Sequence, residues 1–253
     1  MRFLSDEEYG SYWDELCGVR EAIALDLLGE TPAITLDVAC GWGYFTMELA
    51  KGGTGRVVAL DLVHTAFINM RRIFSKEIAA TIEPIIADAS NIPCRSDIFG
   101  LTTSFLGMRD IHMTLGEEGV RETVEEMIRA TRRTGRVAVC VTPPDIAASP
   151  EVDVAIEVEG EIFGAKSLPS SFYIELYSSK RMKPLRSRTY QTGVKMTAEQ
   201  TKIELQDGIQ IAREIYGMDV PGFIEVWNRY GTRIEDYGYA MYSDITVLIG
   251  EKT

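Results

Sequence analysis

The 253-residue sequence contains few of the side chains that hold metal ions or disulfide frameworks. Its four cysteines, Cys17, Cys40, Cys94 and Cys140, are scattered and none stands in a C-x-x-C spacing, and only two histidines occur. Structural zinc sites and disulfide-rich domains need closely spaced cysteines or several histidines. We therefore expect neither a metal site nor a disulfide framework.

The sequence also lacks a long apolar run and an excess of positive charge. It has no run of about 18 apolar residues, and the segment MRFLSDEEYG at its start has no signal-peptide character. We therefore expect no membrane span and a cytoplasmic location. A net charge of −12 argues against binding nucleic acid through its phosphates. The hydrophobic content of 45% is ordinary for a globular protein with a large core.

Residues 34–62 predict a strand, a glycine turn, a helix and a second strand. The apolar run Ile34–Val38 suits a buried parallel strand, and the small residues in the following stretch, ACGWG, allow a sharp turn and close approach to a ligand. A helix is expected from about Tyr44 to Lys51, and the second strand over Arg56–Leu60. Two cofactors, a dinucleotide and one carrying positive charge, could bind such a unit.

The residues around this turn favour the cationic cofactor. A dinucleotide fingerprint has the form G-x-G-x-x-G/A, and here Thr46 occupies the third small position. Asp37, at the end of the first strand, would place negative charge close to a pyrophosphate, whereas it suits an ammonium group and a sulfonium. Asp61 lies twenty residues after Gly41, the spacing at which a carboxylate can meet ribose hydroxyls.

The stretch DVACGWGYF, which starts at Asp37, resembles motif I of the class I S-adenosylmethionine-dependent methyltransferases, acidic-x-Gly-x-Gly-x-Gly. Ala39 replaces the first glycine. The resemblance implies S-adenosylmethionine as the cofactor. The cofactor-binding residues expected from it in this unit are Asp37, Ala39, Gly41, Gly43, Asp61 and Leu62.

Further cofactor contacts are implied by the same resemblance. A third strand over Ile82–Ala87 is followed by Asp88, which would receive the adenine amino group, and by Ala89, whose N–H would meet a ring nitrogen. The backbone carbonyl of Ser104 would accept from the methionine ammonium. Tyr12, on an N-terminal helix expected over residues 5–28, would either cover the cofactor or pack in the core. Acidic residues at three strand ends would lie at one edge of an open sheet.

The alternation of strands and helices predicts an α/β fold. It is a Rossmann-like, seven-stranded, mostly parallel sheet with an antiparallel terminal hairpin and helices on both faces. Further helices are expected over 65–76, 117–133 and from Thr197 to about Tyr216, a fourth strand over 97–105, and a fifth opening at Gly135. The hairpin would pair 223–227 with 242–249. The predicted parts are an N-terminal helical cap (1–32), a cofactor-binding core (33–142), a substrate-side insertion or lid (143–190) and a C-terminal part of the core (191–253).

The insertion contains a basic stretch, and the segment after the fourth strand contains candidate catalytic residues. Lys180 to Arg188 would bind an anionic group of a substrate or form a solvated patch. The segment FLGMRDI, which starts at Phe105, is similar to part of the quinone-biosynthesis C-methyltransferases. This similarity implies a small-molecule acceptor such as a phenol or quinol. Asp110 and His112 are the candidates for a base, although His112 could instead be a surface residue and catalysis could rest on proximity alone.

We therefore predict a methyltransferase that acts on a small molecule, anionic or aromatic. The alternatives are a catalytically inert binding subunit with the same fold and an NAD-dependent oxidoreductase. Binding of nucleic acid is not expected, and the oligomeric state stays open, with a homodimer as one option.

Overall fold

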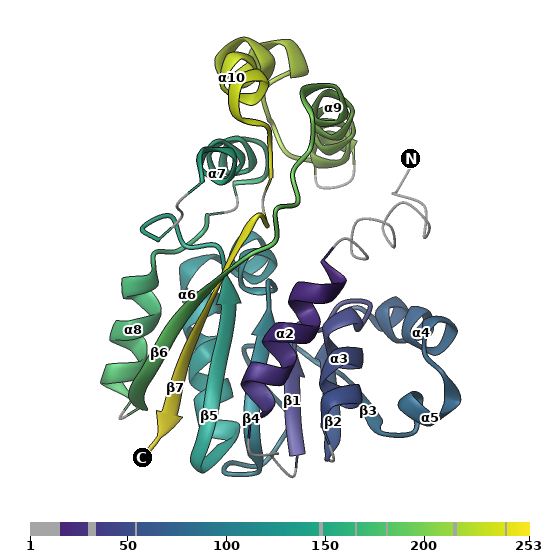
Figure 1. The fold of residues 1–253 in the computed structure, drawn as a ribbon, viewed down its shortest axis with the longest axis vertical. Coiled ribbons are helices and arrows are strands. Elements are labelled where there is room, and N and C mark those ends of the chain that lie inside the picture. Colours follow the sequence, from purple (N-terminus) through teal and green to yellow (C-terminus); the bar gives the residue numbers. More distant parts are fainter. Residues whose placement is uncertain are drawn as a thin grey trace.

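The computed structural model describes residues 16–29, 34–53, 55–146, 149–164, 166–180, 182–214, 217–240 and 242–253. A seven-stranded sheet of order β3-β2-β1-β4-β5-β7-β6 runs through this part of the chain (Figure 1). The strands are β1 Ile34–Val38, β2 Arg56–Asp61, β3 Ile82–Ile86, β4 Phe99–Phe105, β5 Thr131–Val141, β6 Met182–Gln191 and β7 Asp244–Lys252. The first five are parallel, and β7 lies antiparallel between β5 and β6. The predicted fold class is confirmed.

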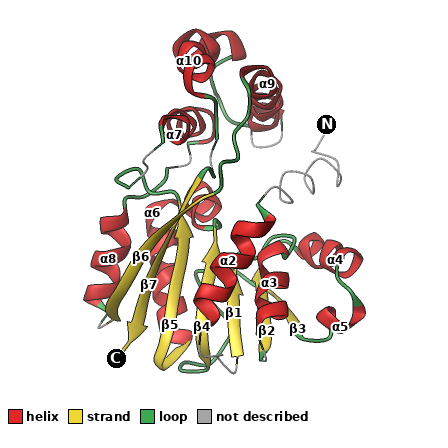
Figure 2. Cartoon of the chain, viewed as in Figure 1, coloured by secondary structure: helices red, strands yellow, loops and turns green. Residues whose placement is uncertain are grey.

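Helices cover both faces of this sheet (Figure 2). They are α2 Cys17–Leu28, α3 Tyr44–Gly52, α4 His64–Ile73, α5 Lys76–Ala79, α6 Met108–Ala130, α7 Pro150–Phe163, α8 Ser170–Ser179, α9 Ala198–Glu214 and α10 Phe223–Tyr237. Helices α6 and α8 share one apolar cluster with the sheet, and α2 and α3 share another on the opposite face. Strands β1 and β4 are therefore buried on both sides. None of the helices in the described ranges is long and apolar enough to cross a membrane.

A cap of three helices stands above the carboxyl edge of the sheet (Figure 1). Helices α7, α9 and α10 pack on one another through their own apolar cluster, which includes Val158, Leu205 and Ile234. Helix α7 precedes β6, whereas α9 and α10 connect β6 to β7. The cap is therefore assembled from segments on both sides of an intervening strand.

The prediction of the sixth strand was wrong. Residues 223–227 belong to helix α10, and β7 pairs instead with β6, which lies at the end of the segment predicted as an insertion. Val226, Tyr230 and Ile234 are buried at intervals of four residues, so their apolar pattern is helical and a five-residue window conceals it. The predicted boundary at residue 190 consequently falls inside a strand of the sheet.

Two helix boundaries also differ from prediction. Helix α4 ends at Ile73, and Ser75 caps the separate helix α5 by accepting from the N–H of Ile78 at 3.4 Å. Helix α6 begins at Met108, earlier than expected. Gly116 bends it with a positive φ of 69°, and the prediction covered only the part of the helix that follows this bend. The strand that follows it begins at Thr131. The predicted helix from Thr197 is confirmed as α9 within a residue or two at each end.

Candidate functional site

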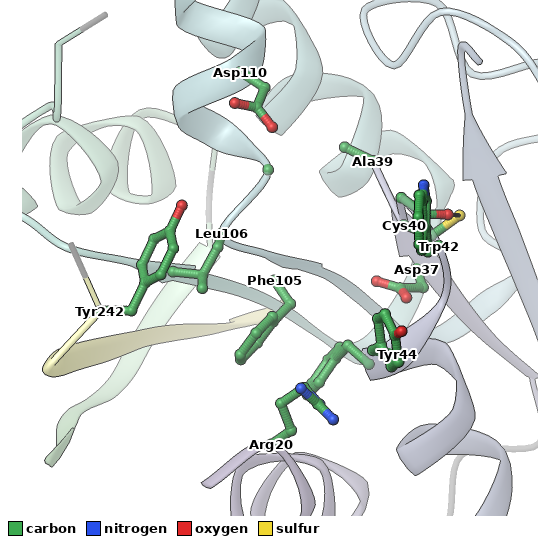
Figure 3. A pocket seen from close by; sticks show the side chains of 13 residues that line it. Arg20, Asp37, Ala39, Cys40, Trp42, Tyr44, Phe105, Leu106, Asp110 and Tyr242 are labelled. Atoms are coloured by element: carbon green, nitrogen blue, oxygen red, sulfur yellow. Dashed lines mark hydrogen bonds between the residues drawn. The ribbon is translucent and has the colours of Figure 1, made fainter. Parts of the chain in front are cut away.

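A pocket opens at the carboxyl edge of the sheet (Figure 3). Its wall is built by α2, by the turns that follow β1 and β4, and by the segment before β7. The residues that line it are Arg20, Asp37, Ala39, Cys40, Gly41, Trp42, Tyr44, Phe45, Phe105, Leu106, Gly107, Asp110 and Tyr242. Segments distant in sequence therefore meet where ligands bind in open α/β sheets.

The turn between β1 and α3 presents bare backbone to this pocket. Ala39, Gly41 and Gly43 all have positive φ, at 54°, 52° and 80°. A Cβ added at Gly41 would meet nothing within 4 Å, so this position faces open space. A Cβ at Gly43 would lie 2.6 Å from Met70 Cε, which explains why glycine is required there. The predicted close approach of backbone to a ligand is thus sterically available.

Asp37 is a buried carboxylate in the wall of the pocket. It is 1% exposed, and its Oδ2 accepts a hydrogen bond from Thr46 Oγ1 at 2.6 Å. Its Oδ1 is buried and has no hydrogen-bond partner among the residues that the structure describes. Burial raises the pKa of Asp37 to about 7, with a smaller increase from the charge of Asp61, and the Thr46 hydrogen bond opposes the shift. A buried oxygen of this kind is suited to a cationic donor supplied by a ligand.

Asp61 ties the end of β2 to the glycine turn. Its Oδ2 accepts from the N–H of Gly41 at 2.8 Å and its Oδ1 accepts from the N–H of Val63 at 2.9 Å. The two bonds set the orientation of the carboxylate, and each oxygen keeps a second lone pair for another donor. Leu62, the next residue, is 67% exposed beside it.

Of the other predicted cofactor residues that the structure describes, none lines the pocket. Asp88 follows β3 at the same edge, and its Oδ1 accepts from both the N–H and the hydroxyl of Ser90 at 2.9 Å. Ala89 packs, partly buried, against the main apolar cluster. Ser104 is fully buried beneath Gly107, where an added Cβ would lie 3.0 Å from its Oγ. Tyr12 lies outside the described residues.

The two predicted catalytic residues are not brought together. Asp110 lines the pocket; desolvation raises its pKa, and the charge of the neighbouring Arg109 opposes the shift. His112 does not line the pocket; its Nδ1 accepts from the N–H of Lys166 at 3.3 Å. Desolvation lowers the pKa of His112, and Lys166 lowers it further. Of the pair, Asp110 alone is placed to meet a ligand in this pocket.

Several lining residues were not predicted. Arg20 is 1% exposed and its guanidinium lies 5.2 Å from the centre of the Tyr44 ring. The rings of Phe45 and Phe105 stack at 4.5 Å. One signal could have identified Arg20, because it stands three residues before the buried Ile23, on the apolar side of its helix. No local pattern marks Tyr242.

A second, smaller cavity, with room for about one water molecule, adjoins the pocket. It shares Leu106 and Tyr242 with the first, and its further lining residues are Met108, Arg109, Val141, Thr142, Ser167, Leu168 and Tyr173. Arg109 forms an ion pair with Glu159 of α7, and the hydroxyl of Tyr239 donates to Glu159 Oε1 at 2.9 Å. These contacts connect the first turn of α6 to the cap.

The basic stretch contributes to neither of these cavities. Arg186 donates to Asp26 Oδ1 on α2 at 2.8 Å, Arg188 lies 3.9 Å from the same oxygen, and the hydroxyl of Tyr190 donates to Asp26 Oδ2. These residues of β6 therefore fasten the edge strand to α2. Among the described residues, no group of three or more His, Cys, Asp or Glu side chains is arranged to hold a metal ion.

Sequence comparisons show which known proteins this chain is similar to. Residues 35–135 match the profile of a family described as "Methyltransferase domain". The ubiquinone/menaquinone biosynthesis C-methyltransferases UbiE of Ectopseudomonas mendocina and Pseudomonas fluorescens are 29% and 31% identical, over 46% and 41% of this chain. The aligned regions span 44% and 40% of those proteins, less than half of their length. The expected similarity to quinone-biosynthesis C-methyltransferases is confirmed.

Solved structures share the fold over nearly the whole chain. The [4+2]-cyclase SpnF has a TM-score of 0.64 at 14% identity and covers 93% of this chain and 80% of its own. Geranyl diphosphate C-methyltransferase from Streptomyces coelicolor A3(2) has a TM-score of 0.58 at 12% identity, with coverage of 93% and 79%. At such identities the likeness concerns the fold alone. Residues 35–135, which match the methyltransferase-domain family, contain the glycine-rich turn and strands β2 to β4 of this sheet.

Proposed function

We propose that this protein transfers a methyl group from S-adenosylmethionine to a small-molecule acceptor. One observation carries the proposal: the buried Oδ1 of Asp37, without a partner in the described part of the chain, in the wall of a pocket lined by bare glycine backbone. A buried carboxylate oxygen without a donor is costly unless a ligand supplies one. The methionine ammonium is such a donor, whereas the pyrophosphate of a dinucleotide would be repelled.

The remaining cofactor residues fit the rest of the molecule. Asp61 is held by two backbone N–H groups in an orientation that leaves lone pairs for ribose hydroxyls. Asp88 and the N–H of Ala89 are suited to the edge of the adenine ring. Arg20 is a pocket-lining cation that suits the methionine carboxylate. When bound, the cofactor supplies an electrophilic methyl group on a sulfonium.

Asp110 and Tyr242 line the part of the pocket where the acceptor would bind, which is called the acceptor end below. Figure 3 shows Asp110 and Arg20 on opposite sides of the pocket, with Tyr242 and Leu106 between them along one wall. Asp110 can accept a hydrogen bond or a proton from an acceptor, and the walls can align its nucleophilic atom with the methyl group. His112 is not part of this proposal because it does not line the pocket.

For the acceptor, the inference extends only to a broad class, a small molecule. The named relatives act in quinone biosynthesis or on geranyl diphosphate, which favours a small-molecule acceptor here. The aromatic or anionic character, the homodimer and the cytoplasmic location expected from the sequence stay predictions. The basic stretch no longer supports an anionic acceptor, because Lys180 pairs with Glu125, and Arg186 and Arg188 pair with Asp26.

The first test is mass spectrometry of small molecules released from freshly purified protein, together with calorimetric titration of S-adenosylhomocysteine. We expect wild-type protein to bind the ligand and Asp37→Ala to lose binding, with Asp26→Ala as a control whose binding is unchanged. Absence of binding at millimolar ligand would refute the proposal. Tight binding of NADH would revive the oxidoreductase alternative. Ligand binding without methyl transfer, together with a stable co-purifying protein, would favour the inert binding subunit.

A further inference from the structure

The second cavity contains a cation that the protein itself neutralises. Arg109 is the positively charged residue among those lining this cavity, and its side chain is 18% exposed. It forms an ion pair with Glu159, whose side chain is 14% exposed. Two charges so far removed from water interact strongly, and breaking such a pair leaves an uncompensated buried charge.

Two tyrosines hold this pair in place. The hydroxyl of Tyr239 donates to Glu159 Oε1 at 2.9 Å, and Tyr239 is 2% exposed. Tyr242 lines both cavities, and its hydroxyl lies close enough to Arg109 for the two groups to interact electrostatically. Donors of the guanidinium are thus engaged by groups of the protein, and an incoming anion would have to displace them.

Arg20 lines the side of the first pocket opposite Asp110, and the charges nearer to Arg109 are mainly negative. Asp110 follows Arg109 in sequence and lines the adjoining pocket. The charge of Asp61 acts on Asp110 from the cofactor side, and Glu204 of α9 lies close enough to Glu159 for their charges to interact. The ammonium of Lys166 acts on His112, outside both cavities. With Arg109 compensated, an anion entering here would meet an unfavourable field, whereas a hydroxyl or an ammonium would find an acceptor.

We propose that Glu159 sets the charge of the acceptor: by neutralising Arg109 it excludes anions, and the acceptor is a neutral or cationic molecule that donates a hydrogen bond to Asp110. Leu106 and Tyr242, which line the first pocket together with Asp110, would contact the body of this molecule. The inference rests on the proposed function in placing the acceptor at this end of the pocket. Glu159, a residue of the cap, would thus select the charge of the acceptor without transferring a proton.

The test compares three probes of similar size and different charge: benzoate, phenol and benzylamine. Their binding to wild-type protein loaded with S-adenosylhomocysteine is measured by calorimetry. Because an uncompensated Arg109 would bind a carboxylate through charge-assisted hydrogen bonds, Glu159→Gln is expected to raise the affinity for benzoate by about tenfold or more. In the wild type, phenol and benzylamine are expected to bind more tightly than benzoate.

Helix α7 provides a matched control. Glu161 forms an ion pair with Arg229 and accepts from the hydroxyl of Tyr230 at 2.8 Å, so its contacts resemble those of Glu159 but lie on the cap away from both cavities. Glu161→Gln is expected to leave all three affinities unchanged. A double variant, Arg109→Gln with Glu159→Gln, removes both charges and should show no gain for benzoate.

A second variant is available if Glu159→Gln unfolds, which a melting curve reveals. Asp110→Asn keeps the buried ion pair and should weaken benzylamine by about tenfold while phenol still binds. The inference is overturned if wild-type protein prefers benzoate, if folded Glu159→Gln gains no affinity for it, or if Asp110→Asn leaves benzylamine binding unchanged. If wild-type protein does not bind S-adenosylhomocysteine, the proposed function fails separately, and the same probe comparison on the unloaded protein still decides the charge selection.

Discussion

Replacing Asp37 by asparagine should stabilise the ligand-free protein at neutral and alkaline pH. Burial raises the pKa of this carboxyl from 3.8 to about 7, so the folded state binds a proton that the unfolded state has already released. Stability of the wild type therefore falls as pH rises from about 4 to about 7, and the loss is complete above that range. A rise of about three pH units corresponds to about 4 kcal/mol.

The expected gain is smaller than this figure. The asparagine oxygen can still accept from Thr46 Oγ1, but its NH₂ group would stand in place of the unpartnered Oδ1 and remain unsatisfied. An unsatisfied buried donor costs about 1–3 kcal/mol, so the net stabilisation should be about 1–3 kcal/mol at pH 8. Below pH 4 the carboxyl is protonated in the folded state, and the two proteins should differ little or the variant should be slightly less stable.

Urea unfolding of both proteins between pH 4 and pH 8.5, with and without S-adenosylhomocysteine, measures this difference. The ligand should stabilise the wild type by about 2.7 kcal/mol at a hundred times its dissociation constant and should not stabilise the variant. If Asp37 had only a structural role, its replacement by asparagine would instead lower the free energy of unfolding, by an amount that does not depend on pH. If the stability difference does not grow between pH 5 and pH 8, or if the variant still gains stability from the ligand, the reasoning about Asp37 is refuted.

Three further predictions concern the glycine turn, the acceptor end and the cap. Gly43→Ala should destabilise the fold by at least about 2 kcal/mol, because its Cβ would overlap Met70 and φ is 80°. Gly41→Ala should cost only about 1 kcal/mol of stability and should mainly weaken cofactor binding. Chemical denaturation and calorimetry of both variants separate the two effects, and equal losses of stability would contradict this prediction. Asp110→Asn should lower kcat without changing the affinity for S-adenosylhomocysteine, which kinetics on an identified acceptor would check; an unchanged kcat would leave proximity as the source of catalysis. Ile234→Ala, at a fully buried position of α10, should cost about 2–5 kcal/mol and increase hydrogen exchange in the cap before the sheet; uniform loss of protection would show that cap and sheet unfold together.

The local pattern of the chain was sufficient for the cofactor half of the molecule. The strand, turn and helix around Gly41 were predicted within a residue or two, because short-range hydrophobic spacing and glycine conformation decide them. The carboxylates Asp37 and Asp61 were placed at one edge because parallel strands end on the same side of a sheet. The observed bond from Gly41 N–H to Asp61 agrees with this placement.

Features that depend on contacts between distant segments could not be derived in this way. A short window suggested a strand at residue 223, although burial at Val226, Tyr230 and Ile234 is helical, and the true sixth strand stood in the supposed insertion. Tyr242 and Glu159 carry no local signal, and their positions follow from how the cap packs over the sheet.

The sequence by itself therefore determined the class of fold, the glycine turn and the acidic residues of the proposed cofactor site, since each depends on neighbours within one strand–helix unit. Tertiary structure alone decided which side chains close the pocket and that Glu159 neutralises Arg109, fifty residues away. The physical reason is that these contacts arise when apolar faces of separate helices and strands are buried together, and no spacing along the chain records which faces will meet.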